Sequence, residues 1–147
     1  TEAVPTETPP MTATPAPAPT PEAPSGTVIG SGSFDSSTGV GLNTHTAWTA
    51  AEQADGSVKL TLSVYVRSYT LEIGQRSIAI SVNGATSGGM TRSFSVDSPN
   101  SQTDTLIYTY STTVQKGSAV SVSVDWNYKG QYSGRDLDVI SSSSTIF

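Results

Sequence analysis

The sequence has no cysteine and a single histidine, His45, among its 147 residues. Without cysteine there is no disulfide, no thiol nucleophile and no thiolate metal ligand. One histidine excludes a multi-histidine metal site. The chain also has no apolar run of about 20 residues, the length that a membrane-spanning helix needs. We therefore expect no metal centre, no cofactor and no membrane span.

Basic residues are few and scattered. The chain has 7 Lys and Arg against 12 Asp and Glu, its net charge is −5, and no Lys or Arg precedes Lys59. Proteins that bind nucleic acids neutralise phosphates with clustered basic side chains. The sequence therefore predicts no nucleic-acid partner.

Proline is concentrated at the start of the chain. Eight of the nine prolines fall within residues 1–24, where glycine is absent and Thr, Ala and Glu predominate. This composition is too poor in apolar residues to form a core, and it favours extended polyproline II. We predict a disordered stalk or linker over 1–24 and one folded domain over 25–147. Since the chain lacks an initial Met and a signal peptide, we interpret it as part of a longer precursor that is anchored upstream.

The domain has the composition and the alternation of a β protein. Ser and Thr make up 39 of the 123 residues from Ser25 onward. Apolar residues recur at every second position over 58–66, 78–82 and 120–126, which is typical of strands with one buried face. Asp55-Gly56 and Lys116-Gly117 predict hairpins between the strands that flank them, and Asn83-Gly84 predicts a turn after 78–82. About eight strands are expected, over 27–34, 43–53, 58–67, 78–82, 94–96, 106–114, 120–128 and 137–139.

These strands predict an all-β antiparallel sandwich, because parallel strands would be apolar on both faces. A barrel is the alternative that the pattern leaves open. The expected core consists of Val58, Leu60, Leu62, Val64, Ile78, Ile80, Leu106, Tyr108, Val120, Val122, Val124 and Trp126.

The polar residues offer little catalytic chemistry. His45 lies in an alternating segment, and a general base there needs an aligned nucleophile and an orienting carboxylate. Asp136 and Asp138 point to the same side of a strand, with Asp125 on a neighbouring row. Such carboxylates can hold Ca²⁺ or flank a glycosidic bond, but a solvated edge strand explains them more simply. We therefore predict no catalytic residue, no metal ligand and no enzyme.

The aromatic residues are the stronger candidates for binding. Trp126 continues a valine row and is expected in the core, whereas Tyr65 falls on the polar side of its strand. Tyr69 and Tyr132 lie in loop-like sequence, and Trp48 lies in a strand without a clear apolar row. Exposed rings on a β-sandwich can stack on sugars, so we list Tyr65, Trp48, Tyr69 and Tyr132 as candidate binding residues. The alternative is cross-strand packing of aromatic rings on a polar face.

Two stretches carry a resemblance to known modules. Residues 126–134 (WNYKGQYSG) and 137–146 (LDVISSSSTI) are similar to the end of an immunoglobulin-like β-sandwich repeat, and 58–84 is loosely similar as well. Such repeats occur in surface proteins of Gram-positive bacteria and in tail and fibre proteins of their phages. The resemblance implies a spacer or a host-surface binder, with no catalytic residues to transfer.

Together these features predict a non-catalytic extracellular module, displayed on a flexible stalk at a bacterial cell surface for adhesion or surface interaction. A carbohydrate-binding module and a structural spacer without a ligand are the alternatives. The expected partner is a polysaccharide or a protein, and the expected oligomeric state is a monomer.

Overall fold

The computed structural model describes residues 26–146, which form twelve strands and no helix. The predicted stalk over 1–24 lies outside the described residues. No helix among the described residues has the length and apolarity to cross a membrane. The all-β class expected from the sequence is therefore confirmed.

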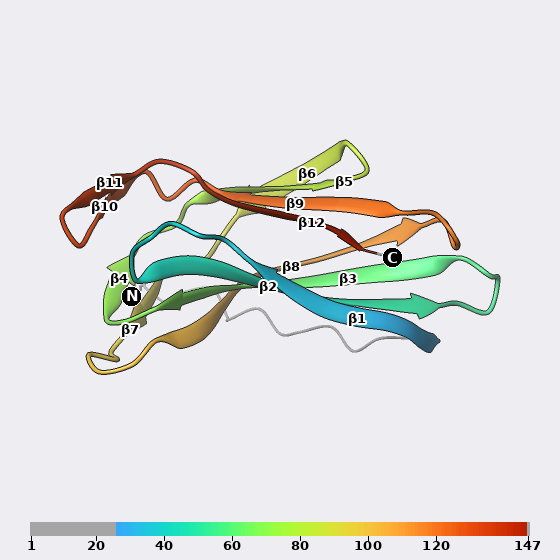
Figure 1. Cartoon of the computed structure of the whole chain (residues 1–147), viewed down its shortest axis with the longest axis horizontal. Helices are drawn as coiled ribbons and strands as arrows, with labels where there is room; N and C mark the ends of the chain where they lie inside the picture. Colours follow the sequence, from blue (N-terminus) through green and yellow to red (C-terminus); the bar gives the residue numbers. More distant parts are fainter. Residues whose placement is uncertain (1–25, 147) are drawn as a thin grey trace, which may run out of the picture.

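Eight strands form two antiparallel four-stranded sheets (Figure 1). In spatial order, the first sheet contains β1 (Thr27–Asp35), β2 (Leu42–Glu52), β3 (Val58–Ser68) and β8 (Thr103–Val114). The second contains β12 (Ile140–Ile146), β9 (Val120–Trp126), β5 (Ser77–Val82) and β6 (Ala85–Met90). Two short two-stranded sheets pair β4 (Leu71–Ile73) with β7 (Phe94–Val96), and β10 (Gly130–Tyr132) with β11 (Arg135–Leu137).

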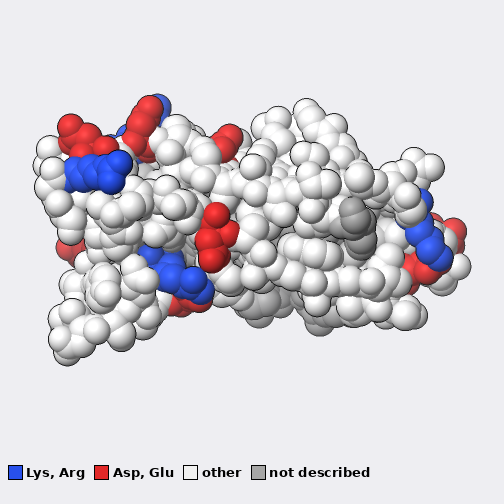
Figure 2. Space-filling view, in the orientation of Figure 1, with Lys and Arg blue, Asp and Glu red and all other residues white. Residues whose placement is uncertain are grey.

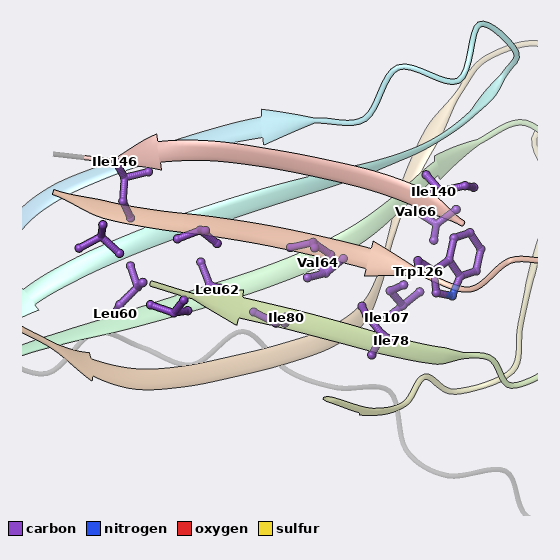
Figure 3. Close-up of a cluster of buried hydrophobic side chains, with 14 of the residues drawn as sticks. Leu60, Leu62, Val64, Val66, Ile78, Ile80, Ile107, Trp126, Ile140 and Ile146 are labelled. Atoms are coloured by element: carbon purple, nitrogen blue, oxygen red, sulfur yellow. The ribbon is translucent and has the colours of Figure 1, made fainter. Parts of the chain in front are cut away.

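The two larger sheets pack face to face around one apolar core, so the fold is β-sandwich-like (Figure 3). β12 packs beside β1 and β2, but no hydrogen-bonded ladder joins the two sheets within residues 26–146. The described strands therefore do not close into the barrel that the pattern left open. The largest fully buried side chains include Trp126, Leu60, Leu62, Ile80 and Ile140.

Ten of the twelve predicted core residues are buried, and the exceptions lie in β8. The ladder between β3 and β8 shifts register, so that Val64 faces Tyr108 while Tyr65 faces Leu106. Ile107 is the extra residue of this β-bulge, and it enters the core. Leu106 consequently lies beside Tyr65 on the outward face, and Tyr108 packs half-buried against the core. The prediction of Leu106 as core was wrong because alternation cannot reveal a bulge.

One of the two predicted hairpins is confirmed, because Asp55-Gly56 joins β2 to β3. The predicted turn at Asn83-Gly84 is also present, with positive φ at both residues, and it joins β5 to the unpredicted strand β6. The other predicted hairpin was wrong. Lys116-Gly117 connects β8 of the first sheet to β9 of the second, so this turn carries the chain from one layer to the other.

Among the strands missing from the sequence prediction, β6 and β12 are poor in apolar residues, whereas β4 (LEI) is only three residues long. β6 reads ATSGGM, and β12 carries a run of four serines between Ile140 and Ile146. The final long strand is therefore β12, whereas the predicted strand over 137–139 overlaps only the end of β11. Both β6 and β12 form because a neighbouring strand with strong alternation provides a ladder for them.

Candidate functional site

One end of the sandwich gathers most of the irregular backbone, and we call it the loop end (Figure 1). It consists of the β1–β2 loop (36–41), the β3–β4 turn (69–70), the β7–β8 turn (97–102) and the β10–β11 hairpin (130–137). Figure 2 shows charged side chains at this end and at the opposite tip, with few across the middle of the visible face. The loop end is therefore one of two charged ends, and it is the one that gathers the loops.

The β1–β2 loop is held in shape by the side chain of Asn43, the second residue of β2. Its Oδ1 accepts hydrogen bonds from the Ser36 hydroxyl at 3.0 Å and from the Thr38 amide at 2.9 Å. Its Nδ2 donates to the Val40 carbonyl at 3.2 Å. The Thr38 hydroxyl also donates to the Leu42 carbonyl at 2.8 Å. This loop is therefore ordered before any ligand arrives, which lowers the entropy cost of binding.

Side chains from two other segments flank this loop. A Cβ on Gly41 would lie 3.0 Å from the ring of Tyr69, in the β3–β4 turn. A Cβ on Gly39 would lie 2.9 Å from Nη1 of Arg135, on β11. Tyr69 approaches from the first sheet and Arg135 from the β10–β11 hairpin, which follows β9 of the second. The absence of a side chain at Gly39 and Gly41 therefore leaves room for Arg135 and Tyr69 beside the β1–β2 loop.

The other loops are braced to one another. The Ser98 amide donates to Thr70 Oγ1 at 3.0 Å, which ties the β7–β8 turn to the β3–β4 turn. Arg76 Nε donates to the Tyr128 carbonyl at 3.0 Å, at the base of the β10–β11 hairpin. The Tyr128 hydroxyl donates to the Gln131 carbonyl at 2.8 Å, and burial raises the pKa of this hydroxyl. Tyr128 is therefore a structural anchor, buried beside Trp126 with ring centroids 5.5 Å apart.

A polar groove of about 580 Å³ lies beside the β1–β2 loop. Asp35, Ser36 and Ser37 form one wall, and residues of β9 and β12 form the remainder, namely Ser123, Asp125, Ser141, Ser142 and Ser143. The lining offers carboxylates and hydroxyls and no aromatic ring. Such a lining suits a ligand with many hydroxyl or amide groups.

His45 and Tyr65 lie on the outward face of the first sheet, opposite each other in register. Nδ1 of His45 contacts a carboxylate oxygen of Asp35, and its ring centroid lies 6.0 Å from that of Tyr65. Arg67 forms a bidentate pair with Asp104, at 2.8 and 3.1 Å, and approaches Asp35 at 3.7 Å. Among residues 26–146, His45 is bonded to no hydroxyl nucleophile.

The four predicted binding residues do not form one row. Trp48 faces inward, opposite Leu62, and its indole packs over Gly32 of β1 and against the core. Tyr65 is half-buried on the outward face, and Tyr132 packs half-buried against the core. Tyr69 is the most accessible of the four, with 40% of its surface exposed. The structure thus brings Tyr69 and Tyr132 to the loop end and separates them from the other two.

Of the acidic residues singled out in the sequence, Asp136 and Asp138 line the same shallow pocket, whereas Asp125 lies in the groove beside the β1–β2 loop. Asp136 is exposed on β11, Asp138 is exposed just beyond it, and Asp125 is half-buried on the outward face of β9. No group of three or more acidic or histidine side chains among the described residues is placed to hold a metal ion.

Sequence reasoning missed Asn43 and the loop that it orders. The run Ser36-Ser37-Thr38-Gly39 is typical of a loop, so its position was readable from composition. Its contacts with Tyr69 and Arg135 were not readable, because they join segments about 30 and 95 residues apart in the chain. No protein-family model, curated protein sequence or solved structure matches this chain.

Proposed function

We propose that this chain is a non-catalytic extracellular module that binds a surface ligand through its loop end. The observation that carries this proposal is the β1–β2 loop, which is ordered by Asn43 and flanked by Tyr69 and Arg135. An aromatic ring and a guanidinium beside a preformed loop supply the two side-chain types that most often dominate binding energy at protein interfaces.

The outward sheet faces are poorer binding surfaces. One cross-strand row of the first sheet consists of Ser33, Ala47, Ser63 and Thr109, and small side chains also cover the second sheet. Small hydroxyl and methyl groups bury little apolar area, so such rows offer no large apolar anchor for a partner. The loop end therefore supports recognition better than either face.

The sandwich and the composition of the stalk support the wider setting of this proposal. Immunoglobulin-like modules of Gram-positive surface proteins, which the sequence resembles, act as spacers or as host-surface binders. A Pro/Thr-rich stalk over 1–24 would hold such a domain away from a bacterial cell surface. Adhesion is then the task that fits a preformed loop surface at one end of the domain.

A carbohydrate ligand is the second candidate, and the polar groove beside the loop favours it. Asp35 and Asp125 with the neighbouring serines can accept and donate hydrogen bonds to sugar hydroxyls. The exposed ring of Tyr69 adjoins the same β1–β2 loop, at Gly41, that supplies Ser36 and Ser37 to the groove. A saccharide that spans the groove and the loop would therefore use both features.

The test is a titration of the ¹⁵N-labelled chain with purified bacterial cell-wall polysaccharides, host glycans and extracellular-matrix proteins, read by amide shifts. We expect shifts at residues 36–41, Tyr69 and Arg135. The variant Tyr69→Ala should weaken binding by about tenfold, which corresponds to ~1.4 kcal/mol.

The matched control is Tyr65→Ala, which removes a tyrosine from the sheet face and should leave affinity unchanged. Loss of binding in Tyr65→Ala with retention in Tyr69→Ala would move the site to the sheet face. A folded chain whose amides respond to no probe would support a structural spacer instead.

A further inference from the structure

The four outer strands of the two larger sheets differ in how they are protected from pairing with other chains. β1 has a bulge at Ile29 and a carboxylate at Asp35, and β8 has a bulge at Ile107 and a carboxylate at Asp104. β12 packs beside β1 and β2. Bulges, charges and covering segments are the usual devices that prevent an edge strand from adding another strand. Three of the four edges therefore carry such a device.

β6 carries none of these devices. Its six residues, ATSGGM, include no charged residue and no proline, and its ladder with β5 runs without a register shift. All six residues are exposed, and Met90 at 58% is the most exposed large hydrophobic residue of the described chain. An edge strand of this kind presents a row of free backbone amide and carbonyl groups.

We propose that β6 pairs antiparallel with β6 of a second copy of this chain, so that two four-stranded sheets become one continuous sheet across a two-fold axis. A second copy of β6 can pair with this edge because the strand carries no charge, so two identical strands do not repel each other. The proposal departs from the monomer expected from the sequence, and it is independent of the loop end.

Side-chain alternation restricts the register of this pair. Thr86 and Met90 face outward, because they lie opposite Ser81 and Ser77 of β5, and Gly88 lies between them, opposite Ala79. Residues opposite each other in an antiparallel pair share a face. An axis through Gly88 satisfies this rule and places Thr86 opposite Met90 of the second copy. Each exposed Met90 side chain then gains a neighbour, and the glycines at the axis bring no side chains into collision.

The first test measures the mass of the whole chain by sedimentation velocity over a range of concentrations. We expect a dimer that dissociates on dilution. Thr86→Lys places a charge on the pairing edge and should shift the mass to that of one chain. The matched control is Thr145→Lys, which changes an exposed, outward-facing threonine on β12, the other edge of the same sheet.

Three outcomes overturn the proposal: a wild-type chain that stays monomeric throughout, a Thr86→Lys variant that still dimerises, or a Thr145→Lys variant that is disrupted to the same extent. A double variant, Thr86→Cys with Met90→Cys, tests whether residue 86 of one copy lies opposite residue 90 of the other. It adds no charge to the edge. The natural chain has no cysteine, and residues 86 and 90 of one strand are too far apart to bridge. Oxidation should therefore yield a covalent dimer, and a product of single-chain mass contradicts the register.

Discussion

The middle of the sandwich and its loop end are held together by different forces. In the middle, alternate residues of β3, β5 and β9 bury apolar side chains, and most outward positions of β5 and β9 carry small residues. At the loop end, hydrogen bonds between distant segments fix the backbone, such as Arg76 to the Tyr128 carbonyl and Ser98 to Thr70. Stability therefore comes mainly from the middle, whereas shape and chemical variety come from the loop end.

This difference separates changes that affect folding from changes that affect recognition. Apolar burial is roughly proportional to area and tolerates few losses in a close-packed core. Partly exposed hydrogen bonds each contribute only about 1 kcal/mol, so a loop surface can change without unfolding the domain. Four substitutions test this separation.

The largest effect is expected in the middle, from Trp126→Ala. The Trp126 side chain is fully buried between Ile78 and Ile140, so its removal should lower the free energy of unfolding by about 3–5 kcal/mol. Urea denaturation measures the loss. The comparison is Trp48→Ala, which removes a half-buried indole that packs over Gly32. This variant should lower the free energy of unfolding by less. Equal losses would mean that burial does not rank these two sites.

A stabilising change is expected from Thr46→Val. The Thr46 hydroxyl is buried in the inward face of β2, opposite Val64, and has no hydrogen-bond partner among the described residues. Valine keeps the shape and removes the unsatisfied group, so the free energy of unfolding should rise by about 1–2 kcal/mol. Thr49→Val, on the outward face of the same strand, is the control and should change stability little. A loss of stability in Thr46→Val would reveal a partner for the hydroxyl.

The part of the structure that could be predicted from the sequence is mainly the middle of the sandwich, and the part that could not is mainly the loop end and the outer strands. The rows over 58–66, 78–82 and 120–126 were predicted because each alternates regularly, and their burial follows from the pattern alone. β6 and β12 were missed because their strand character depends on the neighbours β5 and β9. Tyr69 was a candidate as a loop aromatic, yet its position beside Gly41 results from tertiary packing. The core could thus be predicted from local pattern, and the candidate site only in its residue types.

A smaller effect is expected at the loop end from Tyr128→Phe. This variant removes the hydrogen bond to the Gln131 carbonyl and should lower the free energy of unfolding by about 0.5–1.5 kcal/mol near neutral pH. Burial raises the pKa of the Tyr128 hydroxyl, so the neutral form favours the folded state. That contribution is complete below the unfolded pKa of about 10 and is lost as the pH rises through the raised pKa.

Chemical denaturation between about pH 8 and about pH 11, the range around the ordinary tyrosine pKa, tests the sign of this contribution. The wild-type chain should lose stability more steeply than Tyr128→Phe as the pH increases. Parallel curves for the two proteins would contradict a buried hydroxyl.

The smallest effect is expected from Asp104→Asn, which breaks the bidentate pair with Arg67 on the outward face of the first sheet. Both side chains are about one-third exposed, so solvent screening limits the loss to about 0.2–1 kcal/mol at low salt. Asp97→Asn, a carboxylate with no ion pair among the described residues, is the control. The difference between the two variants should vanish in about 1 M salt, where the Debye length falls to ~3 Å. A loss of stability that persists in high salt would show that Asp104 also contributes to packing. The charged outward face would then contribute to stability together with the apolar core.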